Sequence, residues 1–113
     1  MRDFAQAEQT TTQIDVAQVN DWVARREVLL VDVRETHEFE AEHISGALLL
    51  PLSHFDAESF PVIPGMRVVM HCAIGKRSEA ARKMLANAGH VQVYNMTGGL
   101  SAWKDAGFET EAD

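Results

Sequence analysis

The sequence has few residues that could cross-link or ligate. Its 113 residues include one cysteine, Cys72, and three prolines. A single cysteine excludes an intrachain disulfide and a zinc site built on several thiolates. The four histidines other than the one beside this cysteine show no metal-ligand spacing; they are His37, His43, His54 and His90. We therefore expect no metal and no cofactor, and a chain without disulfides suits the reducing cytoplasm.

Long apolar runs and positive charge are also scarce. The longest apolar stretches, such as residues 28–31 and 47–51, are much shorter than a membrane-spanning helix, and the first ten residues lack the apolar core of a secretory signal. Ten Lys and Arg residues against seventeen Asp and Glu residues give a formal net charge of -7. Nucleic acids and anionic membranes need a basic face. We therefore expect neither as a partner.

The length and composition favour one small globular domain. A chain of this size builds a single core, and its 46% of hydrophobic residues is ordinary for such a domain. The polar start has no periodic pattern. We expect residues 1–10 to be a flexible lead and residues 11–110 to form a single domain.

Helical and strand patterns alternate along this domain. Asp15, followed by Gln18, predicts a helix start, and helical spacing continues to Arg26. Continuous β-branched runs predict buried strands, and the expected strands are 28–33, 47–52, 66–71 and 91–94. Further helices are expected over 35–43 and over 100–106. Another helix is expected after the cysteine, with Gly89 beyond its end. The residues on its buried face would be Ala80, Ala81, Met84, Leu85 and Ala88. Residues 53–65 read as a loop with one helical turn. This alternation predicts an α/β fold with a central, mostly parallel sheet flanked by helices.

The cysteine lies between a buried strand and a helix. The segment is His71-Cys72-Ala73-Ile74-Gly75-Lys76-Arg77-Ser78. In open α/β sheets ligands bind beyond the carboxyl ends of the strands. Gly75 permits the tight turn in which successive backbone N–H groups form an anion nest, and the following helix adds its positive N-terminal end. We therefore expect an anion-binding loop around the thiol.

Positive charge is concentrated around this loop. Residues 67–83 carry five basic residues and one acidic residue, Glu79, which sum to +4 in a chain of net charge -7. A lone cysteine is commonly a buried apolar residue, and a basic run is commonly a solvated helix face. The Cys-x-x-Gly-Lys-Arg context instead favours a nucleophile with a depressed pKa that needs no dedicated base.

Four segments in register resemble the rhodanese family of sulfurtransferases. They are Val31-Asp32-Val33-Arg34-Glu35 with Glu38-Phe39, His43-Ile44-Ser45-Gly46-Ala47 with Pro51, the active loop 69–78, and Tyr94 to Trp103 through Gly98-Gly99. The resemblance extends over roughly Asp15 to Phe108. It implies the rhodanese-like three-layer fold.

The resemblance also implies a reaction. Cys72 would take a sulfane sulfur from a small anionic donor such as thiosulfate and hold it as a persulfide. It would pass the sulfur to cyanide, a small thiol or a protein thiol such as that of a thioredoxin-like partner. The backbone amides of the loop would form the cradle, which comprises Ala73, Ile74, Gly75, Lys76 and Arg77, with Lys76 facing the anion and Arg77 closing the loop. Ile74 departs from the polar or basic residue that the family often has there.

Two alternatives use the same cysteine. A cysteine-dependent phosphatase or an arsenate reductase on this fold would also bind an anion in the loop, but phosphatases of this type have five residues between cysteine and arginine. Here four residues separate Cys72 from Arg77, which leaves a smaller ring. A persulfide carrier that serves one protein partner is the second alternative, and the sequence does not separate it from a free enzyme.

The residues around the loop receive structural roles. Asp32 should bond backbone N–H groups or Arg34, because a buried carboxylate needs partners. Glu38 should pair with Arg34, and the side chain of His71 should face away from the thiol, because neighbouring residues alternate along a strand. Two tryptophans are expected in the core: Trp22 and Trp103. Gly98-Gly99 would let the segment that leads to Trp103 approach the cysteine loop.

Overall fold

A computed structural model describes residues 12–61 and 63–112, so the predicted lead over residues 1–10 lies outside the described residues. Five strands form one parallel sheet in the order β1-β5-β4-β2-β3. The strands are β1 (Gln13–Ile14), β2 (Val28–Asp32), β3 (Leu48–Leu49), β4 (Arg67–His71) and β5 (Val93–Met96). The helices are α2 (Val16–Ala24), α3 (Thr36–Ala41), α4 (Lys76–Asn87) and α5 (Gly99–Asp105), and two 3₁₀ turns are η1 (Leu52–His54) and η2 (Ala57–Ser59). The predicted α/β fold is confirmed.

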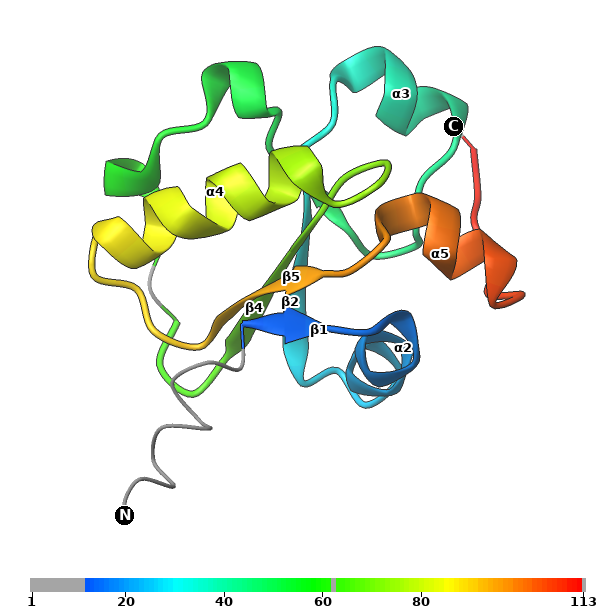
Figure 1. Ribbon diagram of the computed structural model, residues 1–113, viewed down its shortest axis with the longest axis horizontal. Coiled ribbons are helices and arrows are strands. Elements are labelled where there is room, and N and C mark those ends of the chain that lie inside the picture. The colour runs from blue at the N-terminus through cyan, green and yellow to red at the C-terminus, as the bar shows by residue number, and fades with distance from the viewer. Residues whose placement is uncertain (1–11, 62, 113) are drawn as a thin grey trace.

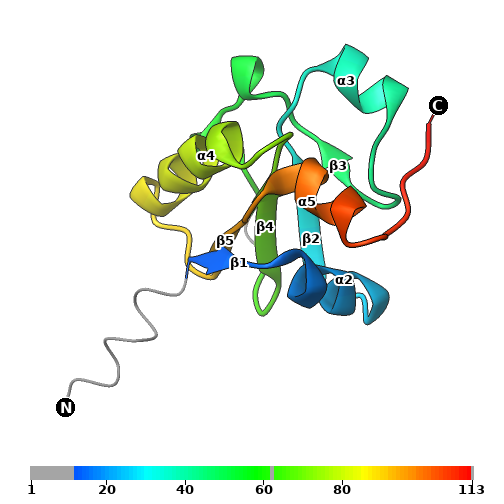
Figure 2. The same cartoon turned by 45° about the vertical axis from the view of Figure 1, so that its right-hand side comes forward.

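The helices cover both faces of the sheet. Helix α4 and the 3₁₀ turns pack on one face, whereas α2 and α5 pack on the other (Figure 1). The central strand β4 shows why: Val68 and Met70 belong to the core under α4, and Val69 belongs to the core under α2 and α5. A strand that is buried on both faces must be apolar throughout, which is the pattern read in the sequence. Figure 2 shows the same three layers from a second direction.

The helix ends follow the local sequence signals. The Asp15 carboxylate accepts a hydrogen bond from the Gln18 backbone N–H at 2.9 Å, which confirms the predicted start of α2. Gly89 has a φ of 98° just beyond α4, the left-handed conformation that glycine adopts at a helix end. Capping by Glu35 and Glu38 at α3 was not predicted.

Other details differ from the sequence-based expectations. The buried residues of α4 are Ser78, Ala81 and Leu85, whereas Ala80, Met84 and Ala88 are exposed. The prediction was wrong because it fitted the apolar residues alone, and the stripe that faces the sheet contains a serine. Strand β5 begins at Val93 rather than residue 91, since Gln92 has a φ of 58° and ends the preceding turn. The short strand β1 was not predicted, and the loop after Pro51 holds two 3₁₀ turns rather than one. No helix within the described residues has the length and apolar character required to cross a membrane.

The start of α5 holds the loop that follows β4. The backbone N–H of Leu100 donates to the carbonyl of Cys72 at 2.8 Å, and the N–H of Ser101 donates to the carbonyl of Ala73 at 3.0 Å. A Cβ on Gly99 would overlap the Cys72 carbonyl oxygen and lie 2.7 Å from the carbonyl carbon of Ala73. Only glycine permits this approach, as the Gly-Gly pair had indicated.

This contact predicts that Gly99→Ala destabilises the domain by about 3 kcal/mol or more, since it adds backbone overlap to left-handed strain. Urea unfolding measures the change. The matched control is Gly107→Ala, because Gly107 has a φ of 85° and no neighbouring atom within 4 Å of the place that a methyl group would take. It should lose only about 1–2 kcal/mol, the usual strain of a left-handed alanine. Equal losses in the two variants would show that the approach of α5 to the loop contributes nothing.

Candidate active site

The cysteine thiol lies at the carboxyl end of β4, under the first turn of α4. Cys72 is 1% exposed. Its Sγ accepts the backbone N–H of Gly75 at 3.2 Å and that of Ser78 at 3.3 Å, and the Ser78 hydroxyl lies 3.3 Å away. Gly75, with a φ of 106°, makes the turn that aims these groups at the sulfur. The loop is therefore a preformed set of donors around one buried sulfur atom.

These contacts shift the ionisation of the thiol. Burial raises the pKa of Cys72, and the hydrogen bonds at Sγ lower it, those from Ser78 most. The hydrogen bonds outweigh burial, so the pKa of the thiol lies below its usual value. The sequence predicted a depressed pKa with a contribution from the flanking cations, and of these Arg77 interacts electrostatically with Cys72.

The structure places the five predicted cradle residues in different roles. Gly75 directs its N–H at the sulfur, and the carbonyl of Ala73 is bound by α5. Ile74 is 60% exposed and Lys76 is exposed, and both line an open hollow of about 540 Å³ beside the loop. Ser78 was missed as a site residue. Its position six residues after the cysteine, in the first turn of a helix, was the available signal.

Arg77 pairs with Glu38 on α3 and also interacts electrostatically with Cys72. Its guanidinium donates to both carboxylate oxygens of Glu38, at 2.8 and 3.0 Å. One expectation was therefore wrong: Glu38 pairs with Arg77 and not with Arg34. The hydrogen bonds from Arg77 lower the pKa of Glu38 from 4.5 to about 2, despite partial burial. This ion pair ties the helix that carries the loop to a neighbouring helix.

Arg34 does not pair with Glu38 because its guanidinium is buried and binds other groups. Its guanidinium binds Asp32 with an Nη2–Oδ2 distance of 2.8 Å and donates to the carbonyl of Glu42 at 2.6 Å. Asp32 also accepts the Arg34 backbone N–H at 2.9 Å, which confirms its predicted structural role. The pair fills the end of β2 beside the loop strand.

His71 lies in this buried polar layer. Its ring is completely buried, with Nε2 3.5 Å from Asp32 Oδ2 and Nδ1 3.4 Å from the Cys72 carbonyl. Burial lowers the pKa of His71, which favours the neutral ring. Neither nitrogen contacts the sulfur, in agreement with strand alternation. Within the described residues, no group of three or more His, Cys, Asp or Glu side chains is placed to hold a metal ion.

The two tryptophans lie away from the thiol. Trp103 is buried in the core under α2 and α5 and donates its Nε1–H to the Glu109 carbonyl at 2.9 Å, as expected of a core residue. Trp22 is only half-buried. Neither lines the hollow beside Ile74. The approach to the cysteine loop is made by the start of α5, not by its tryptophan.

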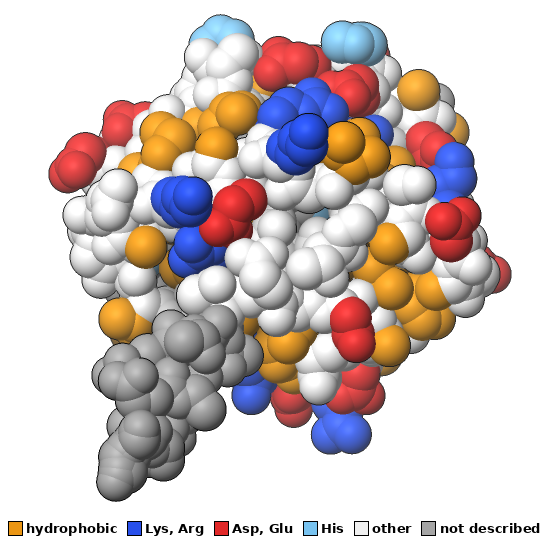
Figure 3. All heavy atoms as spheres, viewed as in Figure 1, with side chains coloured by type: hydrophobic (Ala, Val, Ile, Leu, Met, Phe, Trp, Pro, Cys, Tyr) orange, Lys and Arg blue, Asp and Glu red, His pale blue; other side chains and the backbone are white. Residues whose placement is uncertain are grey.

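The basic run around the cysteine is largely neutralised. Besides the pair formed by Arg77, Arg82 binds Glu79 at 2.7 Å on the same helix. On the face in Figure 3, Lys and Arg side chains lie beside Asp and Glu side chains instead of forming a patch of one sign. The field at the sulfur therefore combines hydrogen bonds from the loop and Ser78 with the partly paired charge of Arg77.

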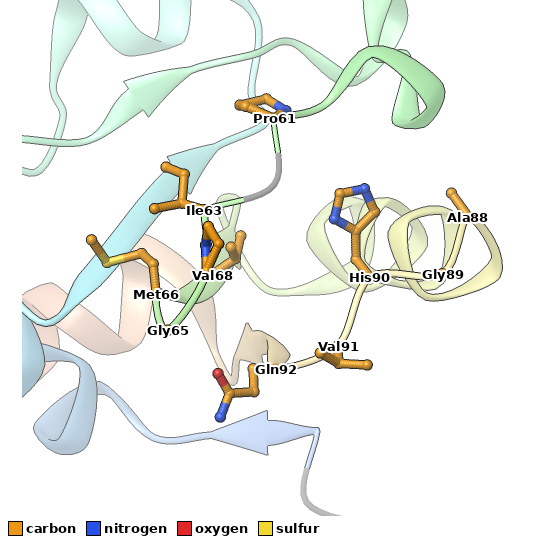
Figure 4. Close-up of a pocket in the computed structure, with 11 residues that line it drawn as sticks. Pro61, Ile63, Gly65, Met66, Val68, Ala88, Gly89, His90, Val91 and Gln92 are labelled. Carbon is orange, nitrogen blue, oxygen red and sulfur yellow. The ribbon is translucent and has the colours of Figure 1, made fainter.

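A separate pocket lies at the other end of the sheet. Its cavity of about 180 Å³ is bordered by Pro61, Ile63, Val68, His90 and Val91 among others (Figure 4). These residues surround the amino-terminal end of β4, whereas Cys72 follows its carboxyl end. This pocket contains none of the residues of the cysteine loop.

Comparison with known proteins identifies the family. The family model of the rhodanese-like domain matches residues 15–106. This chain belongs to the rhodanese family. It is similar to the uncharacterized protein slr1261 of Synechocystis, with 39% identity over 106 residues that cover 92% of this chain and 59% of that protein. The rhodanese chain thus spans about three fifths of that relative's length.

Two further likenesses bear on chemistry. The thiosulfate sulfurtransferase GlpE of Coxiella burnetii is 29% identical over 92 residues, which cover 81% of this chain and 86% of GlpE. The solved structure of RPA3614 from Rhodopseudomonas palustris, named a protein of unknown function and possible tyrosine phosphatase, has a TM-score of 0.78 and 25% identity, with 95% of this rhodanese chain and 89% of that chain covered. The three-layer rhodanese fold is therefore established, with relatives that carry two different names for their chemistry.

The ion pair of Glu38 predicts a specific acid sensitivity. Because the folded-state pKa is depressed, its stabilisation is present above pH 4.5 and is lost as the pH falls toward 2. Both side chains are partly exposed, so we expect only about 1 kcal/mol. Glu38→Gln should be less stable than wild type by that amount at pH 6 in urea unfolding, and the difference should close near pH 2.

The control for this prediction is Glu40→Gln, which removes an exposed carboxylate from the same helix. It should change stability by less than about 0.5 kcal/mol at either pH. A Glu38→Gln deficit that stays constant from pH 6 to pH 2 would contradict a contribution from the ionised pair.

Proposed function

We propose that this rhodanese-family protein is a sulfurtransferase that carries a sulfane sulfur as a persulfide on Cys72. The observation that carries the proposal is the arrangement at Sγ, where the N–H groups of Gly75 and Ser78 converge on a sulfur with a depressed pKa. Donors of this kind stabilise a thiolate and an anionic persulfide alike. The likeness to a thiosulfate sulfurtransferase supports the same chemistry.

The first half-reaction loads the cysteine. The Cys72 thiolate attacks the outer sulfur of thiosulfate, the S–S bond of the donor breaks, and sulfite leaves with the bonding electron pair. The enzyme then holds Cys–S–S⁻, and the two negative charges of sulfite complete the balance. The thiolate needs no separate base at that moment, because its proton has already been lost to solvent.

The second half-reaction removes the sulfane sulfur from Cys72. Cyanide or a thiolate attacks the terminal sulfur of the persulfide, the S–S bond breaks, and the Cys72 thiolate leaves. Cyanide becomes thiocyanate, and a thiolate acceptor becomes a persulfide. The N–H groups that stabilised the resting thiolate also stabilise this leaving group, so one cradle serves both steps.

The loop length favours sulfur transfer over phosphoryl transfer. Four residues separate Cys72 from Arg77, and both outer nitrogens of the Arg77 guanidinium are bound by Glu38. A phosphatase needs donors about 2.7–3.1 Å from each equatorial oxygen of a tetrahedral group. The same geometry argues against arsenate reduction. RPA3614 is therefore similar in fold without requiring a shared reaction.

A persulfide carrier for one protein partner uses the same site. The exposed Ile74 beside Lys76 would contact such a partner, because it presents an apolar side chain on the surface of the loop. A carrier would release sulfur slowly to cyanide and quickly to a protein thiol. The ratio of these two rates therefore distinguishes a carrier from a free enzyme.

Loading predicts a mass change that only Cys72 can carry. Incubation with thiosulfate should increase the intact mass by one sulfur atom, and dithiothreitol should reverse the gain. Cys72→Ser should show no gain, because it has no thiol to hold sulfane sulfur. Near-ultraviolet circular dichroism of the serine variant provides the check on folding. An unmodified wild-type mass after incubation with thiosulfate alone would overturn the proposal, and hydrolysis of an aryl phosphate would favour the phosphatase instead.

Donor attraction predicts different effects for the two cations. Lys76→Ala should lower kcat/KM for thiosulfate about tenfold at low salt, because it removes an exposed charge at the mouth of the loop, and about 0.5 M salt should reduce the difference. Arg77→Lys should lower it at both salt concentrations, since a lysine cannot make the two-point contact with Glu38. Steady-state kinetics at two salt concentrations measures both.

Lys83→Ala is the matched control, since it removes an exposed cation from the same helix at a greater distance along the chain. Its kcat/KM should stay within about twofold of wild type, because exposed charges are screened over about 10 Å. Unchanged efficiency in both Lys76→Ala and Arg77→Lys would show that the basic run is only a solvated helix face.

A further inference from the structure

The Ser78 hydroxyl is shared between the thiol and a buried amide on β5. Its Oγ lies 3.3 Å from Cys72 Sγ and 2.5 Å from Asn95 Oδ1. Ser78 is fully buried and Asn95 is 4% exposed, so water does not compete for these contacts. A hydroxyl has one proton and cannot donate to both neighbours at once. The direction of the hydroxyl proton therefore determines whether the sulfur receives a hydrogen bond from Ser78.

One end of the network fixes the orientation of Asn95. The amide nitrogen of Asn95 lies 3.3 Å from the backbone carbonyl of Gly75. A carbonyl oxygen only accepts, so the NH₂ group must face Gly75 and the amide oxygen must face Ser78. An acceptor then stands against the Ser78 hydroxyl.

A second contact fixes the same orientation independently. The Glu79 carboxylate accepts from Gln13 Nε2 at 2.9 Å, and hydrogen bonding by Arg82 lowers the pKa of Glu79, which keeps it an acceptor. Gln13 must therefore turn its oxygen toward Asn95, whose Nδ2 donates to it at 2.9 Å. Both the loop carbonyl and the surface carboxylate thus turn the oxygen of Asn95 toward Ser78.

The resting hydrogen bonds follow from this order. In the thiol form of the site, Ser78 donates its only proton to Asn95 and accepts from Cys72, so the thiol proton lies between Sγ and Oγ. When the thiol ionises, the Ser78 hydroxyl can stabilise the sulfur only by leaving Asn95, and the buried Asn95 oxygen then loses its donor. We propose that Asn95 is a positioning residue that competes with the sulfur for the Ser78 proton and so opposes ionisation of Cys72.

This competition limits exposure of the reactive form. Oxidants attack the thiolate rather than the thiol, so an amide that favours the thiol slows oxidation of the unloaded cysteine. The backbone N–H groups of Gly75 and Ser78 act in the opposite direction, because they can only donate. The competition affects the ionisation of Cys72 alone and does not depend on sulfur transfer.

The charges around the sulfur are unchanged when Asn95 is replaced by a neutral residue. The charged groups come from α4, α3 and the end of β2 and are Lys76, Arg77, Glu79, Glu38, Asp32 and Arg34, and β4 adds the neutral but titratable His71. A change in thiol ionisation in such a variant therefore reports the hydrogen bonds and not a lost charge.

The test is the pH dependence of alkylation of Cys72 by iodoacetamide, measured by intact mass without thiosulfate or acceptor. Asn95→Leu removes the competing acceptor and keeps the same number of side-chain heavy atoms with the same branching. We expect the pKa of Cys72 to fall by about one unit, a tenfold gain in the ionisation constant, because a buried hydrogen bond no longer opposes ionisation. Asn95→Ala gives the same readout if the leucine variant does not fold.

A double-mutant cycle separates this effect from a loosened loop. In a Ser78→Ala background there is no hydroxyl to release, so Asn95→Leu should leave the pKa unchanged. Gln13→Leu is the matched control in the wild-type background, because the Gly75 carbonyl still orients Asn95. It should shift the pKa by less than a few tenths of a unit.

The outcomes are distinct. A fall in pKa that requires Ser78 supports the competition. An unchanged or raised pKa in both Asn95 variants overturns it, and so does an equal fall in the Ser78→Ala background, which would mean that Asn95 acts through loop geometry. Because the alkylation assay contains no sulfur donor, failure of persulfide formation in the loading experiment would leave this result unaffected.

Discussion

The arrangement of the site depends on the close packing of two backbone segments. Helix α5 begins directly against the loop after β4, where the N–H groups of Leu100 and Ser101 bind the carbonyls of Cys72 and Ala73. These bonds turn the carbonyls of the loop toward α5, which leaves the N–H groups at the start of α4 to face the sulfur. Because the residue at the contact is a glycine, no side chain blocks it. The start of α5 can therefore shape the loop that leads into α4.

Placement of the cysteine follows from the sheet. Strand β4 lies in the middle and is buried on both faces, so its end cannot move without disturbing both halves of the core. The loop inherits this rigidity. Polar pairs then complete the surroundings, with Asp32 and Arg34 buried beside the strand end and Glu38 and Arg77 joining α3 to α4. The sulfur is therefore held by a fixed frame rather than by a flexible lid.

The sequence was informative wherever one local signal determined the structure. The apolar run ending at His71, the capping residue Asp15 and the glycine pair before α5 each predicted what the structure contains. Partner choice was harder, because Glu38 is four residues from Arg34 but binds Arg77, which is 39 residues away. Helix periodicity cannot reveal that Arg34 is already engaged with Asp32. The role of Ser78 was missed for a related reason, since its contacts come from β4 and β5 and only the assembled fold brings them together.

The solitary, buried state of Cys72 has a consequence for the lifetime of anything attached to it. With no second thiol in the chain, an adduct on this sulfur has no intramolecular nucleophile to displace it as a disulfide. At 1% exposure, the unloaded cysteine is also covered by the protein around it. Discharge must therefore come from an external nucleophile, either a small molecule or a thiol presented by a protein partner. The lifetime of an adduct on Cys72 is therefore set by how readily an external nucleophile can reach it.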